Sequence, residues 1–133
     1  MKCSITSNLF LKDRRLLLEL SAPASFGTAL PGQFLHVRVE DSCDPLLRRP
    51  LSIHDVVVTG KKKTVTVRVL YEVVGKGTGL LAQKKPFSVV DVLGPLGHGF
   101  DLKALSGFKT VYLVAGGMGV APLFFLAKKL LEA

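Results

Sequence analysis

The stretch TVTVRVLYEV, residues 64–73, decides the kind of fold that this chain of 133 residues adopts. It is rich in β-branched side chains, which pack well on the pleated surface of a sheet. The stretch LSIHDVVV, residues 51–58, has the same character, and the basic segment GKKK at 60–63 lies between the two. We therefore expect two strands joined by a hairpin, with the lysines at its solvated tip.

Outward from this hairpin, three more runs have the composition of strands. They are RLLLELS (15–21), QFLHVRV (33–39) and FSVVDVLG (87–94). Turn residues separate them, with a proline–glycine pair at 31–32 and GPLGHG at 94–99. Several short strands at this spacing predict an antiparallel barrel or sandwich.

Three segments depart from the β pattern. In GTGLLAQKK (77–85), Thr78 stands ahead of two leucines and is expected to cap a short helix. TVYLVAGG (110–117) is continuously apolar, as buried parallel strands are, and APLFFLAKKLLE (121–132) is typical of a helix. We expect a barrel over residues 1–100 and the first β–α unit of an α/β domain over 101–133.

The net charge of +8, from 18 basic and 10 acidic residues, favours anionic partners such as nucleic acid, acidic proteins or phosphorylated cofactors. Nucleic-acid binders combine a long basic stripe with interleaved aromatic side chains. Here the basic residues are mostly scattered, and the aromatic residues are only eight phenylalanines and two tyrosines. We expect no nucleic-acid partner, and keep a non-enzymatic basic barrel that binds nucleic acid or protein as an alternative.

No apolar run is long enough to span a membrane, and MKCSITSNLF at the start lacks the features of a signal peptide. We expect a cytoplasmic chain without membrane contact. Cys3 and Cys43 are far apart and form no CxxC pair, so we expect two reduced thiols and no zinc or iron–sulfur site.

RRPLSIHD (48–55) is the first candidate for chemistry. An arginine at the start of a strand can offer a planar fork of donors to a pyrophosphate, and the hydroxyl of Ser52 can bond the edge of a heteroaromatic ring. Pro50 and Ser52 share a face of the strand, because alternate residues do. The alternative is a solvated arginine pair beside an ordinary strand.

LYEVVGKGTGLL (70–81) is the second candidate. Glycines at a helix N-terminus let backbone N–H groups approach an anion, and Tyr71 could pack on a flat ring. The alternative is a flexible turn with a threonine cap. In AGGMGVAP (115–122), the order strand, glycine turn, helix is that of a dinucleotide phosphate site, although the spacing is not GxGxxG. There the alternative is a tight packing turn.

Acid–base and metal chemistry have poor candidates. The histidines His36, His54 and His98 have no metal-ligand spacing, and we expect each to be structural or exposed. Asp41, Asp44 and Asp55 are near arginines in the sequence, so we expect ion pairs. The chain is predicted to hold a cofactor that does the chemistry.

The motifs RRPLSI, LYEVVGKGT, DVLGPLGHGF and LVAGGMGVAP, in this order and spacing, resemble the ferredoxin-reductase superfamily, and particularly the electron-transfer subunits of type B dihydroorotate dehydrogenases. The resemblance implies a six-stranded antiparallel Greek-key barrel that binds FAD, followed by an α/β domain that binds NAD. Residues 1–100 would be the barrel and 101–133 the start of that domain, so we expect the chain to be the front half of a two-domain subunit.

The resemblance also implies roles for particular residues. Arg49 would hold the pyrophosphate, and Ser52 would approach the flavin N5. The residues implied to bind cofactor are Arg49, Pro50, Leu51, Ser52, Leu70, Tyr71, Glu72, Gly77 and Thr78 for FAD, and Gly116, Gly117 and Gly119 for the nicotinamide nucleotide. His98 stands where the family more often has asparagine.

In the family, electrons from dihydroorotate pass through a partner's FMN and a 2Fe-2S cluster to FAD, and then to NAD, in pyrimidine biosynthesis. The implied partner is the dihydroorotate dehydrogenase catalytic subunit, but the four cysteines of the cluster are absent here. Similar barrels serve flavin reductase subunits of ferredoxin–NADP, sulfide dehydrogenase and hydrogenase systems, which are the sibling alternative. We expect the apolar C-terminal helix, with Phe124, Phe125 and Leu130, to fold back on the barrel or to mediate self-association.

Overall fold

The computed structural model describes residues 1–41, 43–58, 64–105 and 107–132. The basic segment at 60–63, expected to be a solvated hairpin tip, lies outside the described residues. The strands and helices follow one another in the order β1 (Lys2–Lys12), β2 (Arg15–Pro23), β3 (Phe34–Arg38), β4 (Arg49–Val57), β5 (Thr64–Glu72), α1 (Lys76–Gln83), β6 (Val89–Leu96), α2 (Leu102–Leu105) and α3 (Val120–Glu132). Short 3₁₀ turns at Ala24–Thr28 and Gly117–Gly119 complete them.

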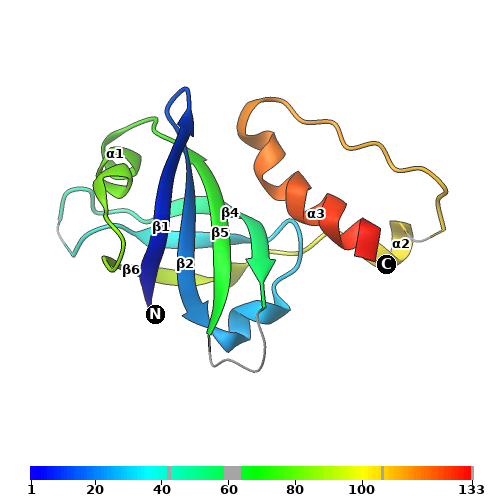
Figure 1. Cartoon of the computed structure of the whole chain (residues 1–133), viewed down its shortest axis with the longest axis horizontal. Coiled ribbons are helices and arrows are strands. Elements are labelled where there is room, and N and C mark those ends of the chain that lie inside the picture. Colours follow the sequence, from blue (N-terminus) through cyan, green and yellow to red (C-terminus); the bar gives the residue numbers. More distant parts are fainter. Residues whose placement is uncertain (42, 59–63, 106, 133) are drawn as a thin grey trace.

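The six strands form a closed barrel in the order β1-β2-β5-β4-β3-β6, and every neighbouring pair is antiparallel (Figure 1). Strands β3, β4 and β5 are consecutive, and β6 returns to lie beside β3, which is a Greek key. The six-stranded antiparallel Greek-key barrel expected from the sequence is confirmed.

The barrel interior is filled by alternate residues of the strands. In β2 the inward positions are Leu16, Leu18 and Leu20, and in β5 they are Val65, Val67, Val69 and Tyr71. Phe26, from the first 3₁₀ turn, is fully buried and joins the same core. Each such aliphatic side chain contributes about 1.5–3 kcal/mol by leaving water, so the core accounts for the stability of the barrel.

Strand β1 was not among the runs that sequence patterns single out. Only Cys3 and Ile5 of β1 are buried, and its second half is largely exposed, so the strand lacks a regular alternation. It is held instead by two neighbours, β2 along most of its length and β6 at Lys2–Ser4. The first strand therefore closes the barrel by pairing with the last.

The start of α1 differs from the expectation. The helix begins at Lys76 with Gly75 as the N-cap residue, and Thr78 is the third helical residue. The prediction that Thr78 caps the helix from the N-cap position is wrong, because the chain already turns into the helix at Gly75. The Thr78 hydroxyl still serves that end, since it accepts hydrogen bonds from the N–H groups of Val74 and Gly75.

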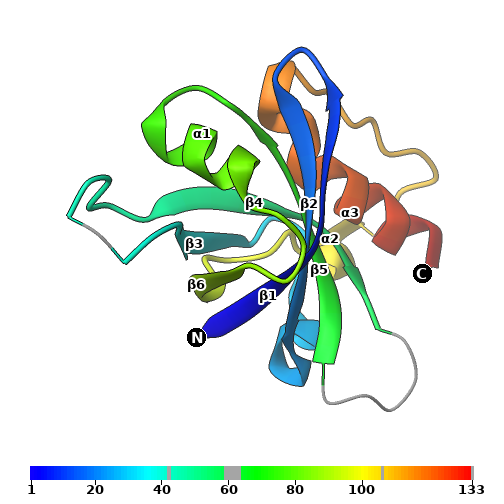
Figure 2. The same cartoon turned by 60° about the vertical axis from the view of Figure 1, so that its left-hand side comes forward.

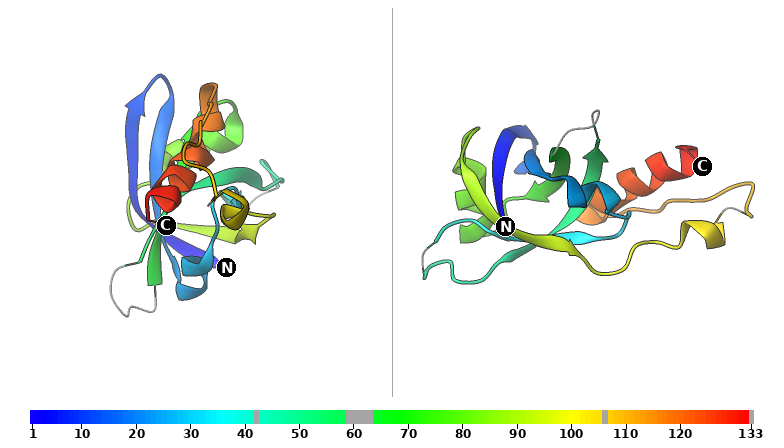
Figure 3. Two further views of the ribbon diagram at one scale, coloured as in Figure 1. Left: turned by 90° about the vertical axis from the view of Figure 1, so that its right-hand side faces the viewer. Right: turned by 90° about the horizontal axis from the view of Figure 1, so that it is seen from below.

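The expected buried strand at 110–117 is not formed. This segment is extended but pairs with no described strand, and Tyr112 and Val114 are 87% and 89% exposed. It runs past α3, away from the barrel (Figures 1 and 3). An apolar run becomes a strand only where a neighbour supplies its hydrogen bonds, and no described segment does so here.

Helix α3 packs against β4 and β5 on the outside of the barrel. Ala121, Phe125 and Leu126 are its buried residues, while Phe124 is about half exposed. We expected this helix either to fold back on the barrel or to mediate self-association, and in the structure it folds back on the barrel. Among the described helices, none has both the length and the apolar character needed to cross a membrane.

Candidate functional site

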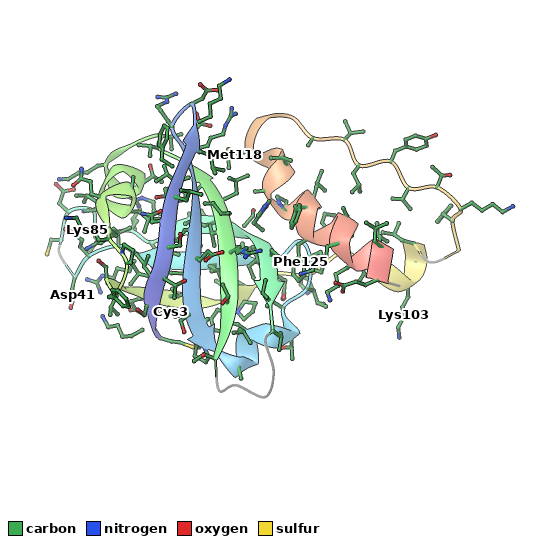
Figure 4. All side chains as sticks on the ribbon, in the orientation of Figure 1. Cys3, Asp41, Lys85, Lys103, Met118 and Phe125 are labelled. Carbon is green, nitrogen blue, oxygen red and sulfur yellow. The ribbon has the colours of Figure 1, made fainter. Side chains whose placement is uncertain are left out.

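A groove of about 350 Å³ lies where β4 begins, β5 ends and the turn before α3 passes. Helices α1 and α3 lie on the two sides of this end of the barrel (Figures 1 and 2). The groove is lined by Arg49, Pro50, Leu51, Ser52, Leu70, Tyr71, Glu72, Val74, Thr78, Met118 and Ala121. Figure 4 shows Met118 at the start of α3, above the strand ends. The volume is in the range of small-molecule sites.

The groove brings together most of the residues predicted to bind FAD. All of them except Gly77 line it, and Gly77 touches the Arg49 side chain. Gly116, Gly117 and Gly119 are not among the lining residues, although Met118 between them is. Sequence reasoning missed Val74, Met118 and Ala121, because a single apolar residue in a turn or at the start of a helix carries no signal of what it faces.

Arg49, which lies against Gly77, forms the basic end of the groove. A Cβ atom placed on Gly77 would lie 2.2 Å from Arg49 Nε, so the guanidinium occupies the space that a side chain would fill. Arg49 Nη1 donates a hydrogen bond of 2.7 Å to the Leu47 carbonyl. The backbone N–H groups of the first turn of α1 have no partner within the helix, and they lie beside this cation. Together they offer hydrogen-bond donors and positive charge of the kind that suits an anion.

Thr78 contributes the shape of the turn. Its hydroxyl accepts from Val74 N at 3.0 Å and Gly75 N at 3.2 Å, and donates to the Gly75 carbonyl at 3.1 Å. The single hydroxyl proton is therefore used inside the turn. The turn itself is fixed, which keeps Gly77 against Arg49.

Arg48 and Arg49 have separate roles, so they are not a solvated pair. Arg48 does not line the groove and instead binds Asp91 on β6. Its Nη2 lies 2.7 Å from Asp91 Oδ2, and its Nη1 donates to the Asp91 backbone carbonyl at 2.9 Å. Hydrogen bonds from the N-terminal ammonium and from Arg48 lower the pKa of Asp91 to about 2. Arg48 fixes the strand and leaves Arg49 to face the groove.

Tyr71 supplies a rigid wall beneath the groove. The residue is 2% exposed, and its hydroxyl donates to Asn8 Oδ1 at 3.1 Å. Burial raises the pKa of Tyr71 to about 12, so the phenol stays neutral. Only a small part of the ring is open to the groove, beside the half-buried Leu70 and Ser52.

His54 fixes the other wall of the groove. Its Nδ1 lies 2.8 Å from the Ala121 carbonyl, so this nitrogen carries the proton and donates. The ring stacks on Phe124 with centroids 4.7 Å apart. His54 is therefore a structural histidine, as expected, and it holds the first turn of α3 over the groove.

Asp55 anchors α3 through a buried ion pair. The residue is 2% exposed, and its carboxylate lies 2.9 Å from Lys128 Nζ and 3.4 Å from Arg68 Nη1. The ion pairs expected for the three aspartates are therefore confirmed. Asp55 pairs with Lys128, Asp41 pairs with Arg38 at 3.0 Å, and Asp44 pairs with Lys76. Cys3 is buried, Cys43 is exposed, and both are free thiols. The described residues contain no cluster of metal-ligating side chains.

No family model matches the sequence. Comparison with solved structures places the fold in the class of ferredoxin–NADP⁺ reductase-like barrels. An NADH-dependent reduced ferredoxin-NADP oxidoreductase, studied for flavin-based electron bifurcation, matches with a TM-score of 0.81 and 30% identity over 98% of this chain and 44% of its own. Ferredoxin-NADP⁺ reductase from Plasmodium falciparum matches with a TM-score of 0.67 and 17% identity over 99% of this chain and 53% of its own, which supports the fold alone.

Within that class, the chain is similar to curated electron transfer subunits of dihydroorotate dehydrogenase B (NAD⁺). The subunit from Bacillus caldolyticus is 45% identical over 129 residues, which are 97% of this chain and 49% of the relative. The subunit from Desulforamulus reducens is 50% identical over 113 residues, 85% of this chain and 41% of the relative. The chain thus spans about half the length of the curated relatives it matches. The resemblance inferred from the four motifs is confirmed.

Proposed function

We propose that the chain binds FAD and forms the flavin-binding part of an electron-transfer subunit of the dihydroorotate dehydrogenase B type. The observation that carries this proposal is the contact of Arg49 with Gly77, at one end of a groove floored by Leu70, Tyr71 and Ser52. Because Gly77 has no side chain, the Arg49 guanidinium can lie directly against the N-terminus of α1. A guanidinium and free backbone N–H groups in this arrangement fit a pyrophosphate.

In this proposal the flavin supplies the redox chemistry, and the protein binds and orients it. Arg49 and the first turn of α1 hold the pyrophosphate, and Ser52 offers its hydroxyl to the ring edge near N5. Pro50, Leu51, Leu70, Tyr71 and Glu72 line the ring. Gly116 and Gly117 have open space where a Cβ would stand, which suits the close approach of a nicotinamide nucleotide.

The wider circuit is also a proposal, taken from the relatives' names and the resemblance. Electrons from dihydroorotate would arrive from a catalytic partner subunit, by way of its FMN and an iron–sulfur centre, and leave to NAD. The two cysteines of this chain are no cluster site, because Cys3 is buried in the barrel. Residues 101–133 would open the NAD-binding domain, and the C-terminal helix stays a candidate for self-association.

A flavin reductase of a ferredoxin–NADP system is the second candidate. It is favoured by the TM-score of 0.81 to the NADH-dependent reduced ferredoxin-NADP oxidoreductase. Both candidates use the same flavin groove, so they differ in the electron donor and not in the cofactor.

The test is to add FAD to the purified chain, desalt it, and record the visible absorption spectrum. Retained flavin bands are expected for the wild type. Arg49→Ala removes the cation and is expected to weaken FAD binding by roughly tenfold or more, as charge-assisted hydrogen bonds contribute about 1.5–3 kcal/mol. A colourless wild type, with salt-dependent binding to an oligonucleotide, would support the basic binding module instead.

A further inference from the structure

Asn8 on β1 does not line the groove, yet its side-chain amide makes several hydrogen bonds beside it. Its Nδ2 donates to the carbonyls of Leu81 at 2.9 Å and Lys84 at 3.1 Å, with that of Ala82 at 3.5 Å. Its Oδ1 accepts from the Tyr71 hydroxyl at 3.1 Å. The orientation of the amide follows from its neighbours, because carbonyls require the donor and the Tyr71 hydroxyl finds the acceptor.

The carbonyls that Asn8 binds are those at the C-terminal end of α1. This helix has eight residues, and helices of that length are marginal without tertiary contacts. At this end the Leu81 carbonyl accepts from the backbone N–H of Lys84 at 3.1 Å, and Lys84 at the C-cap is extended, so no glycine motif closes the helix and the Asn8 amide adds the side-chain donor. Leu81, fully buried, and Asn8 therefore fix α1 on the barrel.

The opposite end of α1 forms the proposed pyrophosphate site. Gly77 and Thr78 belong to its first turn, and Gly77 lies against the Arg49 guanidinium. A helix this short moves as one body, so a shift at Leu81 displaces Gly77 as well. Through its second bond, the same amide restrains Tyr71, which is part of the groove wall.

We propose that Asn8 is a positioning residue for FAD, which sets the place of the α1 N-terminus relative to Arg49 by binding the carbonyls at the other end of the helix. This inference rests on the proposed function, since it deepens the role of the same groove. Asn8 touches no cofactor in this scheme and acts through α1 and Tyr71.

The experiment measures the FAD dissociation constant by quenching of flavin fluorescence, and the unfolding midpoint in urea, for wild type and variants. Asn8→Ala removes the side-chain donor to the carbonyls of Leu81 and Lys84 and is expected to raise the dissociation constant about tenfold. Asn8→Asp is expected to raise it further, because a carboxylate then faces those carbonyls. The visible spectrum of FAD at saturation should stay that of the wild type, because the ring contacts at Ser52 and Leu70 are intact.

Two controls separate positioning from loss of stability. Thr6→Ala on the same strand removes an exposed hydrogen bond to the Glu19 carbonyl, and should leave the dissociation constant unchanged. Ile5→Val trims the barrel core on the same strand; it should lower the urea midpoint without weakening FAD binding. If Asn8→Ala does not fold, Tyr71→Phe removes only the hydroxyl, and should raise the dissociation constant severalfold.

A dissociation constant for Asn8→Ala within about twofold of the wild type would overturn the inference while the proposed function stands. Equal weakening by Asn8→Ala and by Ile5→Val would overturn it too, because stability alone would then explain the effect. A wild type that takes up no FAD overturns the proposed function, and this inference with it.

Discussion

At the scale of single residues, Gly77 is the position where the groove depends on the absence of a side chain. Arg49 Nε would stand 2.2 Å from a Cβ at this position, and Arg49 Cζ would stand 2.7 Å from it. The guanidinium is the far end of a flexible side chain, so it can move aside at little cost to the fold. Its position is therefore sensitive to Gly77, whereas the barrel is not.

Gly77→Ala should separate binding from stability. Alanine is the better helix former by about 1 kcal/mol, so the urea midpoint is expected to stay or rise, while FAD affinity falls because Arg49 is displaced. Gly79→Ala in the same helix is the matched control. Its Cβ would meet Val73 Cγ1 at 3.9 Å, an ordinary contact, so it should gain stability and keep its FAD affinity. Equal FAD affinities for the two variants would contradict the role of Gly77.

At the scale of elements, α3 shows how a short helix is held on a barrel by a few specific contacts. Phe125 and Leu126 supply the buried apolar face, His54 binds the Ala121 carbonyl, and Asp55 binds Lys128. The buried carboxylate is satisfied from several sides, because the Val56 N–H and Arg68 also reach it. Met118 and Ala121 are thereby kept at the groove.

Lys128→Ala should loosen α3 without unfolding the barrel. The ammonium donates to Asp55 and to the Val56 carbonyl, and its loss is expected to cost about 1–2 kcal/mol of local stability. Hydrogen exchange would then accelerate in α3 while the amides of β2 and β5 stay protected. Lys129→Ala is the control, since Lys129 pairs with Glu132 of the same exposed helix face. Faster exchange in Lys129→Ala than in Lys128→Ala would refute the anchoring role of Lys128.

At the scale of the whole molecule, the barrel is closed by contacts between its two ends in the sequence. Lys2, Cys3 and Ser4 pair with Asp91, Val90 and Val89. Asp91 adds an ionic clamp at the seam, since its carboxylate binds both the N-terminal ammonium at 2.8 Å and Arg48 at 2.7 Å. The seam therefore combines a β ladder with charge.

The clamp predicts an acid-dependent term in stability. The pKa of Asp91 is about 2 in the folded chain, below its ordinary value, so its contribution is complete above about pH 4 and is lost as the pH falls through 2. With solvent screening, that contribution is about 1 kcal/mol. Urea unfolding at several pH values should give stabilities of wild type and Asp91→Asn that differ at pH 7 and approach each other as the pH falls through 2. Parallel curves would show that Asp91 contributes no such term.

Sequence reasoning succeeded where local chemistry decides the structure. The valine-rich β5 and the glycines around the start of α1 predicted a strand and a turn into a helix, since β-branched side chains and glycine act on their own backbone. Sequence reasoning failed where contacts with residues distant in the sequence decide the structure. Strand β1 has only two buried residues, Asn8 acts on a helix far along the chain, and the apolar run at 110–117 lacks a partner strand.

The pairing of β1 with β6 also fixes the order in which the barrel can form during synthesis of the chain. β1 and β2 are made before β6, so β1 has no second neighbour until Val89–Asp91 of β6 have been made. The wall formed by Met118 and Ala121 emerges later still. During synthesis, a flavin would therefore meet a half-open barrel with Arg49 already present, and this groove could be completed only when α3 docks.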